Sequence, residues 1–186
     1  YLHAKTTPPF LRVVAPKDFG PGSMKLLPVM KNYKELYSAV EIAEAATAIT
    51  RKDWDAYEAS WDFTTLPILD AKFRTDTLKG TWASLRAYWR EMTEQVQRLE
   101  EENNRIFIEA YDLRDELTPD VSLEEITLTC NPAYRYGGKK GEAELEVLLL
   151  ADTMREFVSY AVGCMFGRYS LDTPGLILAN QGEGLQ

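Results

Sequence analysis

The chain has 186 residues, 45% of them hydrophobic, which is enough to bury a core in one domain or two small ones. No apolar run approaches the roughly 18 residues that a membrane-spanning helix needs, so a soluble protein is expected. The chain carries 21 Lys and Arg residues against 29 Asp and Glu residues, a formal net charge of −8. This negative charge excludes a protein that binds nucleic-acid phosphates electrostatically over its whole surface.

The basic residues are concentrated at the N-terminal end. Up to Lys34 the sequence contains six basic residues and one acidic residue, whereas acidic residues dominate from Glu35 onward. Proline and glycine interrupt residues 1–31 so often that no long helix is expected there, and only residues 10–14 have the composition of a strand. We therefore expect a proline- and glycine-rich basic arm over residues 1–31, which composition favours for any unaided contact with nucleic acid.

Residues 33–51 contain no glycine or proline and are predicted to form the first helix, which Asn32 can cap. Apolar residues occupy more than one side of this helix, so it should pack on more than one face. Asp53 then offers a second cap before a short helical turn that carries Trp54 and Tyr57.

The central region has the clearest periodic pattern. Between Thr77 and Tyr111 the seam positions recur at alternating steps of four and three, which predicts one long helix with a single buried seam. The seam consists of Leu78, Trp82, Leu85, Trp89, Met92, Val96, Leu99, Asn103, Ile106 and Ala110. Asn103 is its polar member, and such a residue usually fixes helix register at some cost in stability.

Residues 126–129 are β-prone but too short to found a sheet, and a loop through Asn131 and Gly138 should follow. Residues 142–166 are predicted to form another helix, on which Gly163 and Gly167 would let a second backbone approach closely. The expected buried positions of this helix are Leu145, Leu148, Leu149, Met154, Phe157, Val158, Ala161 and Met165. We expect a mainly α helical domain over residues 32–173 with at most a minor β pairing, and a linker or cut end over residues 174–186.

Residues 131–134, Asn-Pro-Ala-Tyr, are similar to the Asn-Pro-Pro-Tyr-like loop with which amino-methyltransferases hold the target amino group. That role needs a preceding strand in a Rossmann-like sheet and an upstream glycine loop for the methyl donor. Residues 18–23 form a double-glycine segment, but Pro21 removes a backbone donor there and no helix begins directly afterwards. A turn is favoured at both places.

Two further clusters allow a functional and a structural interpretation. An acidic cluster suggests a metal site, but its spacing does not put all four residues on one helical face, so caps and solvated side chains are favoured. It consists of Asp53, Asp55, Glu58 and Asp62. An aromatic cluster could stack on bases, but it sits among acidic residues, so core packing is favoured. It consists of Trp54, Tyr57, Trp61 and Phe63.

The cysteines and the single histidine limit the remaining chemistry. Cys130 and Cys164 lie far apart, which is typical of reduced thiols in a cytoplasmic protein rather than of a disulfide framework. With His3 as the one histidine and no cysteine pair at ligand spacing, neither a structural zinc site nor a histidine-based triad is expected. We assign no catalytic, cofactor-binding or metal-ligating residue to this chain.

Several stretches together resemble the segment that follows the catalytic domain in PglX, the family of large adenine-specific DNA methyltransferases of BREX phage-defence systems. In order, they cover most of residues 33–180. They are residues 60–63 (Ser-Trp-Asp-Phe) with Leu66 and Pro67, residues 101–108 (Glu-Glu-Asn-Asn-Arg-Ile-Phe-Ile), residues 115–119 (Asp-Glu-Leu-Thr-Pro), residues 124–132 and residues 159–172.

The resemblance implies that the parent protein transfers a methyl group from S-adenosylmethionine to adenine N6 in DNA. It also implies that the catalytic motifs lie upstream, so that this chain is not the chemical centre, and it leaves open whether the chain only spaces two domains or itself touches DNA or a partner. Our first hypothesis is a non-catalytic helical spacer between the catalytic and target-recognition domains. An alternative is a protein-interaction module that docks another defence-system subunit. Candidate interface residues are Trp61, Phe63, Arg168 and Tyr169, and no membrane partner is expected.

Overall fold

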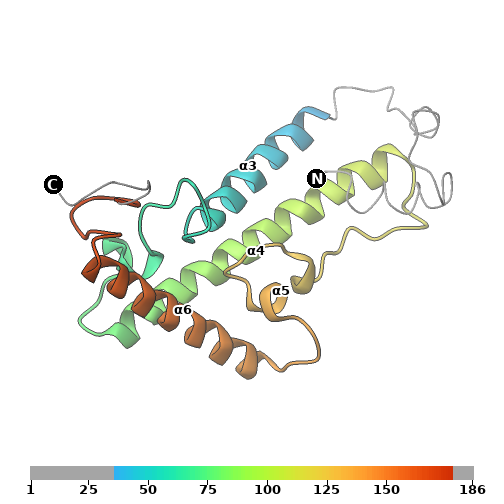
Figure 1. Ribbon diagram of the computed structural model, residues 1–186. Coiled ribbons are helices and arrows are strands. Elements are labelled where there is room, and N and C mark those ends of the chain that lie inside the picture. The colour runs from blue at the N-terminus through green and yellow to red at the C-terminus, as the bar shows by residue number, and fades with distance from the viewer. Residues whose placement is uncertain (1–35, 178–186) are drawn as a thin grey trace, which may run out of the picture. The chain divides into compact units, whose positions relative to one another are not determined.

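The structure is a computed structural model that describes residues 36–177. These residues are mainly helical and contain no strand, which confirms the predicted fold class (Figure 1). None of their helices is long and apolar enough to cross a membrane. The expected arm over residues 1–31, the start of the first predicted helix and the end of the expected linker lie outside the described residues.

Helices α4 and α6 begin and end within one residue of the predicted positions, and α3 ends three residues after its predicted end. Helix α3 covers Leu36–Trp54, α4 covers Leu78–Ala110 and α6 covers Glu142–Met165. A hydroxyl cap starts α4, since Thr77 Oγ1 accepts a hydrogen bond from the backbone N–H of Gly80 at 3.0 Å. Gly141 precedes α6 without a side-chain cap, and Glu142 and Glu144 lie in its first turn, where the helix dipole favours acidic side chains.

The chain divides into two compact units. The described part of the first unit comprises residues 36–48 and 96–122, and that of the second comprises residues 49–95 and 123–177. Both α3 and α4 pass from one unit into the other.

In the first unit, the C-terminal half of α4 holds the segment that follows it. Gln97 donates from Nε2 to the carbonyl oxygen of Val121 at 2.7 Å, and the apolar residues Val96, Phe107 and Val121 are buried. Two residues after the end of α4, Asp112 adopts a left-handed conformation with φ 56°, and the N–H of Leu113 donates to the carbonyl oxygen of Ile108. This backbone arrangement satisfies carbonyl groups at the helix end.

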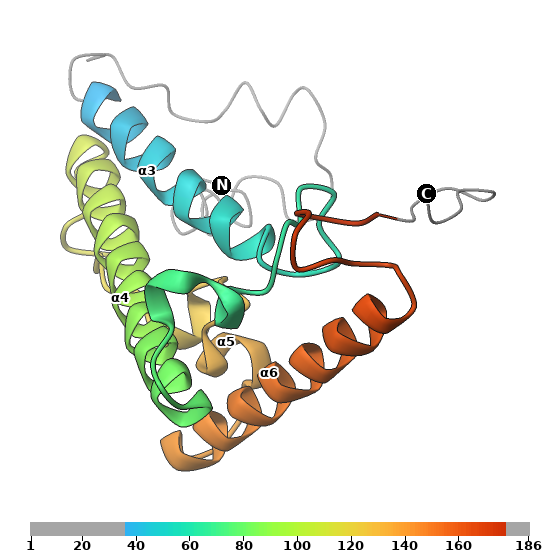
Figure 2. The same cartoon turned by 90° about the vertical axis from the view of Figure 1, so that its left-hand side faces the viewer.

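In the second unit, short helical turns precede both α4 and α6 in the chain. They are the 3₁₀ turns η2 (Pro67–Leu69), η3 (Ala71–Phe73) and η4 (Leu123–Glu125) and the short helix α5 (Pro132–Tyr136). Helix α5 packs on η4 and on α6, and Figure 2 shows it on one side of α6. The fully buried side chains of this core are Leu85, Ile126, Leu128, Cys130 and Leu149.

The structure corrects one local prediction and adds detail to another. Residues 126–129, expected to be too short to found a sheet, form no strand, and Ile126 and Leu128 are fully buried in an irregular segment between η4 and the cap of α5. The loop expected from Asn131 contains the helix α5, since Pro132 stands at its first position, where a missing backbone donor costs nothing.

The predicted seam is buried only in its middle. Leu85, Trp89 and Met92 are buried in the second unit, and Val96 and Asn103 are buried in the first. Leu78 is 50% exposed because it lies in the first turn of α4, and Leu99 and Ile106 are partly exposed. The seven-residue pattern therefore predicted the helix better than it predicted the burial at its ends.

Candidate functional site

Of the four candidate interface residues, two are exposed and two are buried. Trp61 has a fully exposed side chain, and Arg168 is exposed while it pairs with Glu58. Phe63 and Tyr169 are only 7% and 3% exposed, so neither offers its ring to a partner. An interface at this place remains a prediction, and its accessible members are Trp61 and Arg168.

Phe63 and Tyr169 instead form an aromatic corner with Tyr160 of α6. Tyr160 and Tyr169 stack with ring centroids 4.8 Å apart, and Phe63 meets Tyr169 edge-on at 5.8 Å. Gly163 makes this contact fit, since a Cβ atom at that position would lie 2.5 Å from Cδ2 of Tyr169. The close neighbour at Gly163 is therefore a side chain of the same chain, and not the second backbone that was predicted there.

The end of α6 turns the chain back toward this corner. Helix α6 ends at Met165, so the prediction that Gly167 lies on the helix is wrong: Gly167 has φ 73°, a left-handed conformation that glycine adopts without strain. The N–H of Arg168 donates to the carbonyl oxygen of Gly163 at 2.9 Å, and the N–H of Ile177 donates to that of Arg168 at 2.9 Å. These bonds hold residues 168–177 against the helix end.

Helix α6 carries an exposed apolar row, which we call the outer stripe: Val147, Leu150, Met154, Val158, Val162 and Met165. Met154 is partly exposed, and the other five are between 37% and 82% exposed. Val158 and Met165 were predicted to be buried, and the structure shows the opposite, because the buried side chains of α6 are on its other side, at Leu149, Thr153 and Tyr160.

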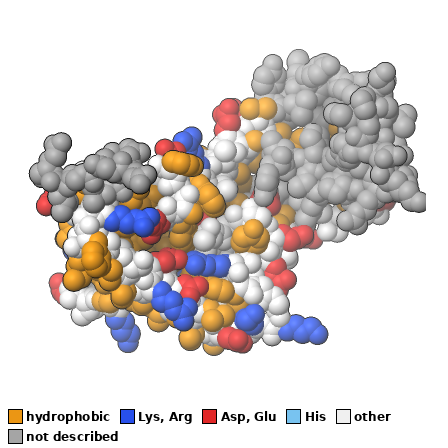
Figure 3. Space-filling model, in the orientation of Figure 1, with side chains coloured by type: hydrophobic (Ala, Val, Ile, Leu, Met, Phe, Trp, Pro, Cys, Tyr) orange, Lys and Arg blue, Asp and Glu red, His pale blue; other side chains and the backbone are white. Residues whose placement is uncertain are grey.

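The outer stripe continues past the end of the helix. Phe166 is 76% exposed and Leu171 is 79% exposed, and neither is charged. Figure 3 shows hydrophobic side chains at the surface on the side where Figure 1 places α6. The second unit thus presents a mainly apolar surface along α6 and around its C-terminal end.

A polar cluster links α5 to the buried side of α6. Arg135 donates from Nη2 to Oε1 of Glu156 at 3.0 Å, and the hydroxyl of Tyr136 donates to Oδ2 of Asp152 at 2.7 Å. The hydrogen bond from Tyr136 holds the pKa of Asp152 below its ordinary value. Burial raises the pKa of Tyr57, whose ring lies beside Arg135, so this phenol stays protonated.

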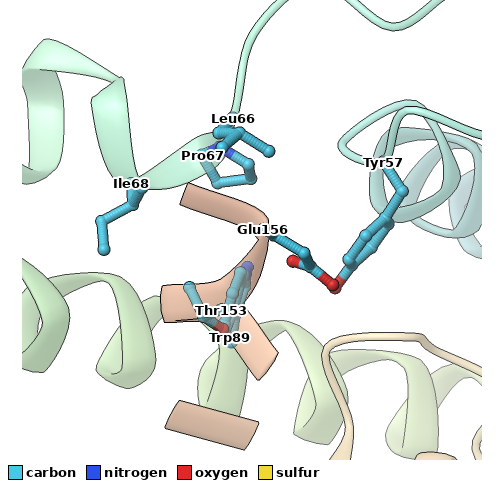
Figure 4. A pocket seen from close by; sticks show the side chains of 7 residues that line it. All are labelled: Tyr57, Leu66, Pro67, Ile68, Trp89, Thr153 and Glu156. Atoms are coloured by element: carbon cyan, nitrogen blue, oxygen red, sulfur yellow. The ribbon is translucent and has the colours of Figure 1, made fainter. Parts of the chain in front are cut away.

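A small hollow lies between this cluster and the turn η2. Its lining includes Tyr57, Leu66, Trp89 and Glu156, and Figure 4 shows Tyr57 and Glu156 directed toward each other. The hollow holds about 10 Å³, room for roughly one water molecule. The buried hydroxyl of Tyr57 has no protein hydrogen-bond partner. The hollow fits an ordered water, and it is far too small for a nucleoside or a methyl donor.

Asn131 begins the Asn-Pro-Ala-Tyr stretch that is similar to a methyltransferase loop, and its side chain holds the local backbone. Its side-chain nitrogen donates to the carbonyl oxygens of Leu123 at 2.7 Å and Ile126 at 2.9 Å. Its side-chain oxygen accepts from the N–H of Ala133 at 3.1 Å, which caps α5, and the residue is 2% exposed. Both donors of this amide are engaged and its oxygen is buried, so the side chain holds backbone and does not face an open site.

The acidic cluster is divided between the interior and the surface. Asp53 was expected to be a cap or solvated, but it lies within α3 and is 4% exposed. Its carboxylate accepts from the N–H groups of Thr129 at 2.6 Å and Cys130 at 3.0 Å. Asp55 and Asp62 both pair with Arg51 instead. Sequence reasoning missed the role of Asp53, because its partners follow 76 and 77 positions later.

The structure also bears on the metal-ligating side chains and on the aromatic cluster. No group of acidic, cysteine or histidine side chains among residues 36–177 could hold a metal ion. Trp54 is 54% exposed and Trp61 fully exposed, so core packing was a wrong prediction for these two members of the aromatic cluster.

Burial raises the pKa of the Cys130 thiol, and the nearby Asp53 carboxylate raises it further. A thiol with a raised pKa is a poor nucleophile.

No protein-family model matches the chain. It is 31% identical over 183 residues to the adenine-specific methyltransferase PglX of Lacticaseibacillus casei (strain Zhang), and the match covers 96% of this chain and 14% of that protein. It is 32% identical over 166 residues to the adenine-specific methyltransferase BrxX of Escherichia coli O9:H4 (strain HS), covering 89% of this chain and 13% of that protein. The resemblance found from the residues is confirmed, and the chain spans about one seventh of these relatives' length.

Proposed function

We propose that this chain is a non-catalytic helical spacer of an S-adenosylmethionine-dependent adenine-N6 DNA methyltransferase that acts in BREX phage defence. The observation that carries the proposal is the match of almost the whole chain to about one seventh of two adenine-specific methyltransferases. Residues 32–173 would then be a helical domain that links the catalytic domain to the target-recognition domain, in the cytoplasm.

The shape of the main helix supports a spacing role. Helix α4 has 33 residues without interruption, which corresponds to a length of about 50 Å at 1.5 Å per residue. Gln97, at its centre, and Asn104 donate to backbone carbonyl oxygens of the segment that follows the helix. Such polar contacts fix geometry and leave the chemistry to other parts of the parent protein.

The polar residues described above do not fit the methyl donor. Asn131 and Asp53 use their side chains to hold backbone, and the hollow beside Tyr57 admits about one water molecule. The donor, which supplies the methyl group when bound, and the target DNA are therefore proposed as ligands of the parent protein outside residues 36–177.

A second candidate is an interaction module that docks another subunit of the defence system. The exposure of the outer stripe favours it, because contiguous apolar surface on a helix commonly marks an interaction site. Trp61 is fully exposed, so its ring is also available to a partner.

Titrating the 186-residue chain with S-adenosylmethionine in a calorimeter tests the spacer proposal. We expect no saturable heat, because the hollow beside Tyr57 admits about one water molecule and the Asn131 side chain is engaged in holding backbone. Light scattering during size exclusion should show a monomer if the chain is a spacer. Tight, saturable donor binding would overturn the proposal, and a stable oligomer would favour the interaction module.

A further inference from the structure

Helix α6 is apolar on two opposite sides. Leu149, Thr153 and Tyr160 pack into the second unit, whereas the outer stripe lies on the opposite side of the helix. Successive members of the stripe are separated by steps of three or four residues, from Val147 to Met165. A helix that is apolar on two sides is normally covered on two sides.

The spacing of the stripe specifies the shape of what would cover it. Steps of three and four residues produce the row that one helix offers to another helix lying along it. The exposed charged residues Glu144 and Arg155 stand beside the row and not within it. An amphipathic helix, with its apolar side on the stripe and its polar side in water, fits this pattern.

Two covers are compatible with the extent of this surface, a second copy of the chain and a segment of the same polypeptide, because Phe166 and Leu171 extend the exposed apolar area past the stripe. A stable interface between separate proteins buries about 800 Å² of accessible surface on each partner. A segment of the same polypeptide needs less area, because its effective concentration is on the order of millimolar.

We propose that an amphipathic helix from another part of the same, longer polypeptide packs along the outer stripe of α6. The matched relatives support this source, since about six sevenths of each lies outside the segment to which this chain corresponds. The inference rests on the proposed function, in that it takes this chain to be a segment of such a protein. The packing of this amphipathic helix would make α6 the element through which the spacer contacts a neighbouring part of the polypeptide.

Methionine oxidation tests the contact, because Met165 is 82% exposed and Met92 is 5% exposed in the same unit. The 186-residue chain and the full-length parent are treated with hydrogen peroxide, and mass spectrometry measures the oxidation rate at each methionine. We expect Met165 to oxidise at least tenfold more slowly in the parent than in the 186-residue chain. Met92 should be slow in both and serves as the internal reference.

Two matched variants of the parent separate this contact from general protection. Val158→Asp places a charge in the stripe, and Ser159→Asp places the same charge on an exposed neighbour outside it. Val158→Asp should restore fast oxidation of Met165, whereas Ser159→Asp should not. Both variants should melt like the wild type in the 186-residue chain, because both side chains are exposed there.

Three results would overturn the inference: equal oxidation rates of Met165 in chain and parent, equal effects of the two variants, or protection in the isolated chain that rises with concentration as a dimer forms. DNA methylation by the parent is measured in the same preparations. If the parent methylates DNA but its Met165 oxidises as fast as in the 186-residue chain, the contact is rejected and the spacer proposal is unaffected. If Met165 is protected but the parent does not methylate DNA, the methyltransferase role is rejected and the contact is unaffected.

Discussion

The Asp53 carboxylate accepts hydrogen bonds from two consecutive backbone N–H groups, at Thr129 and Cys130. Without the carboxylate, the Cys130 donor would be buried without this partner and the Thr129 donor would be partly buried without it, since Cys130 is fully buried and Thr129 is partly exposed. A buried donor without a partner costs more than the hydrogen bond itself contributes. Asp53 is therefore a structural residue in spite of its charge.

Asp53→Asn should destabilise the fold by about 2 kcal/mol, because an amide has one accepting oxygen and turns its NH₂ group toward a donor. Asp62→Asn is the matched control, since Asp62 is exposed and its ion pair with Arg51 should contribute less than about 1 kcal/mol. Urea unfolding of both variants measures the difference. Equal midpoints for the two variants would show that the Asp53 contacts carry no stability.

Gly80 has a similarly local constraint at the start of α4. Replacing glycine by alanine inside a helix usually stabilises it by about 1 kcal/mol. Here the new Cβ atom would collide with Oγ1 of Thr75, which donates to the carbonyl oxygen of Thr77 at 2.9 Å. Gly80→Ala should instead destabilise the protein by about 1 kcal/mol or more, through overpacking.

The Gly80→Ala effect should change sign in the Thr75→Ala background, where the colliding oxygen is absent. Thermal melting of the two single variants and the double variant completes the cycle. A Gly80→Ala variant that is more stable than wild type with Thr75 intact would contradict the steric argument.

At the scale of elements, the sequence predicted the helices well and their surroundings poorly. The ends of α4 and α6 were predicted within one residue, because periodic apolar positions, Thr77 and the glycines near Gly141 are all local signals. The exposure of Val158 and Met165 was not predictable, since periodicity shows that a side is apolar but not what covers it.

The candidate site shows the same division. Sequence favoured a turn near Asn131, and the structure shows that Asn131 caps a short helix, α5, which Pro132 begins. The burial of Phe63 and Tyr169 depends on the return of residues 168–177 to α6, which no short stretch of sequence encodes. The β-prone composition of residues 126–129 belongs to an irregular segment, in which Ile126 and Leu128 are buried alternately as they would be in a strand.

At the scale of the molecule, ion pairs join helices within the second unit. Arg86 of α4 meets Glu146 of α6 through two hydrogen bonds, of 2.8 and 2.7 Å, and Arg90 adds a third. These bonds, first of all those from Arg86, hold the pKa of Glu146 below its ordinary value of 4.5. A lowered pKa in the fold means that the unfolded chain binds the proton more readily.

Stability from Glu146 should therefore be fully present above pH 4.5 and be lost as the pH falls through the lower, folded pKa. Urea unfolding between pH 7 and pH 3 should show a steeper loss for wild type than for Glu146→Gln. Glu144→Gln, an exposed position on the same helix, is the control and should follow the wild type. If the unfolding free energy of all three chains falls equally with pH, the ion pair between Arg86 and Glu146 does not contribute to stability in acid.

The hydrogen bonds of Asp53 also bear on how quickly the chain can fold. They close a loop of 76 positions, and the entropy lost in such a closure must be overcome before the contact contributes any free energy. The local turns of α3, α4 and α6 need no such closure and can form first. Losing the carboxylate should thus leave the refolding rate almost unaltered while the native chain opens faster.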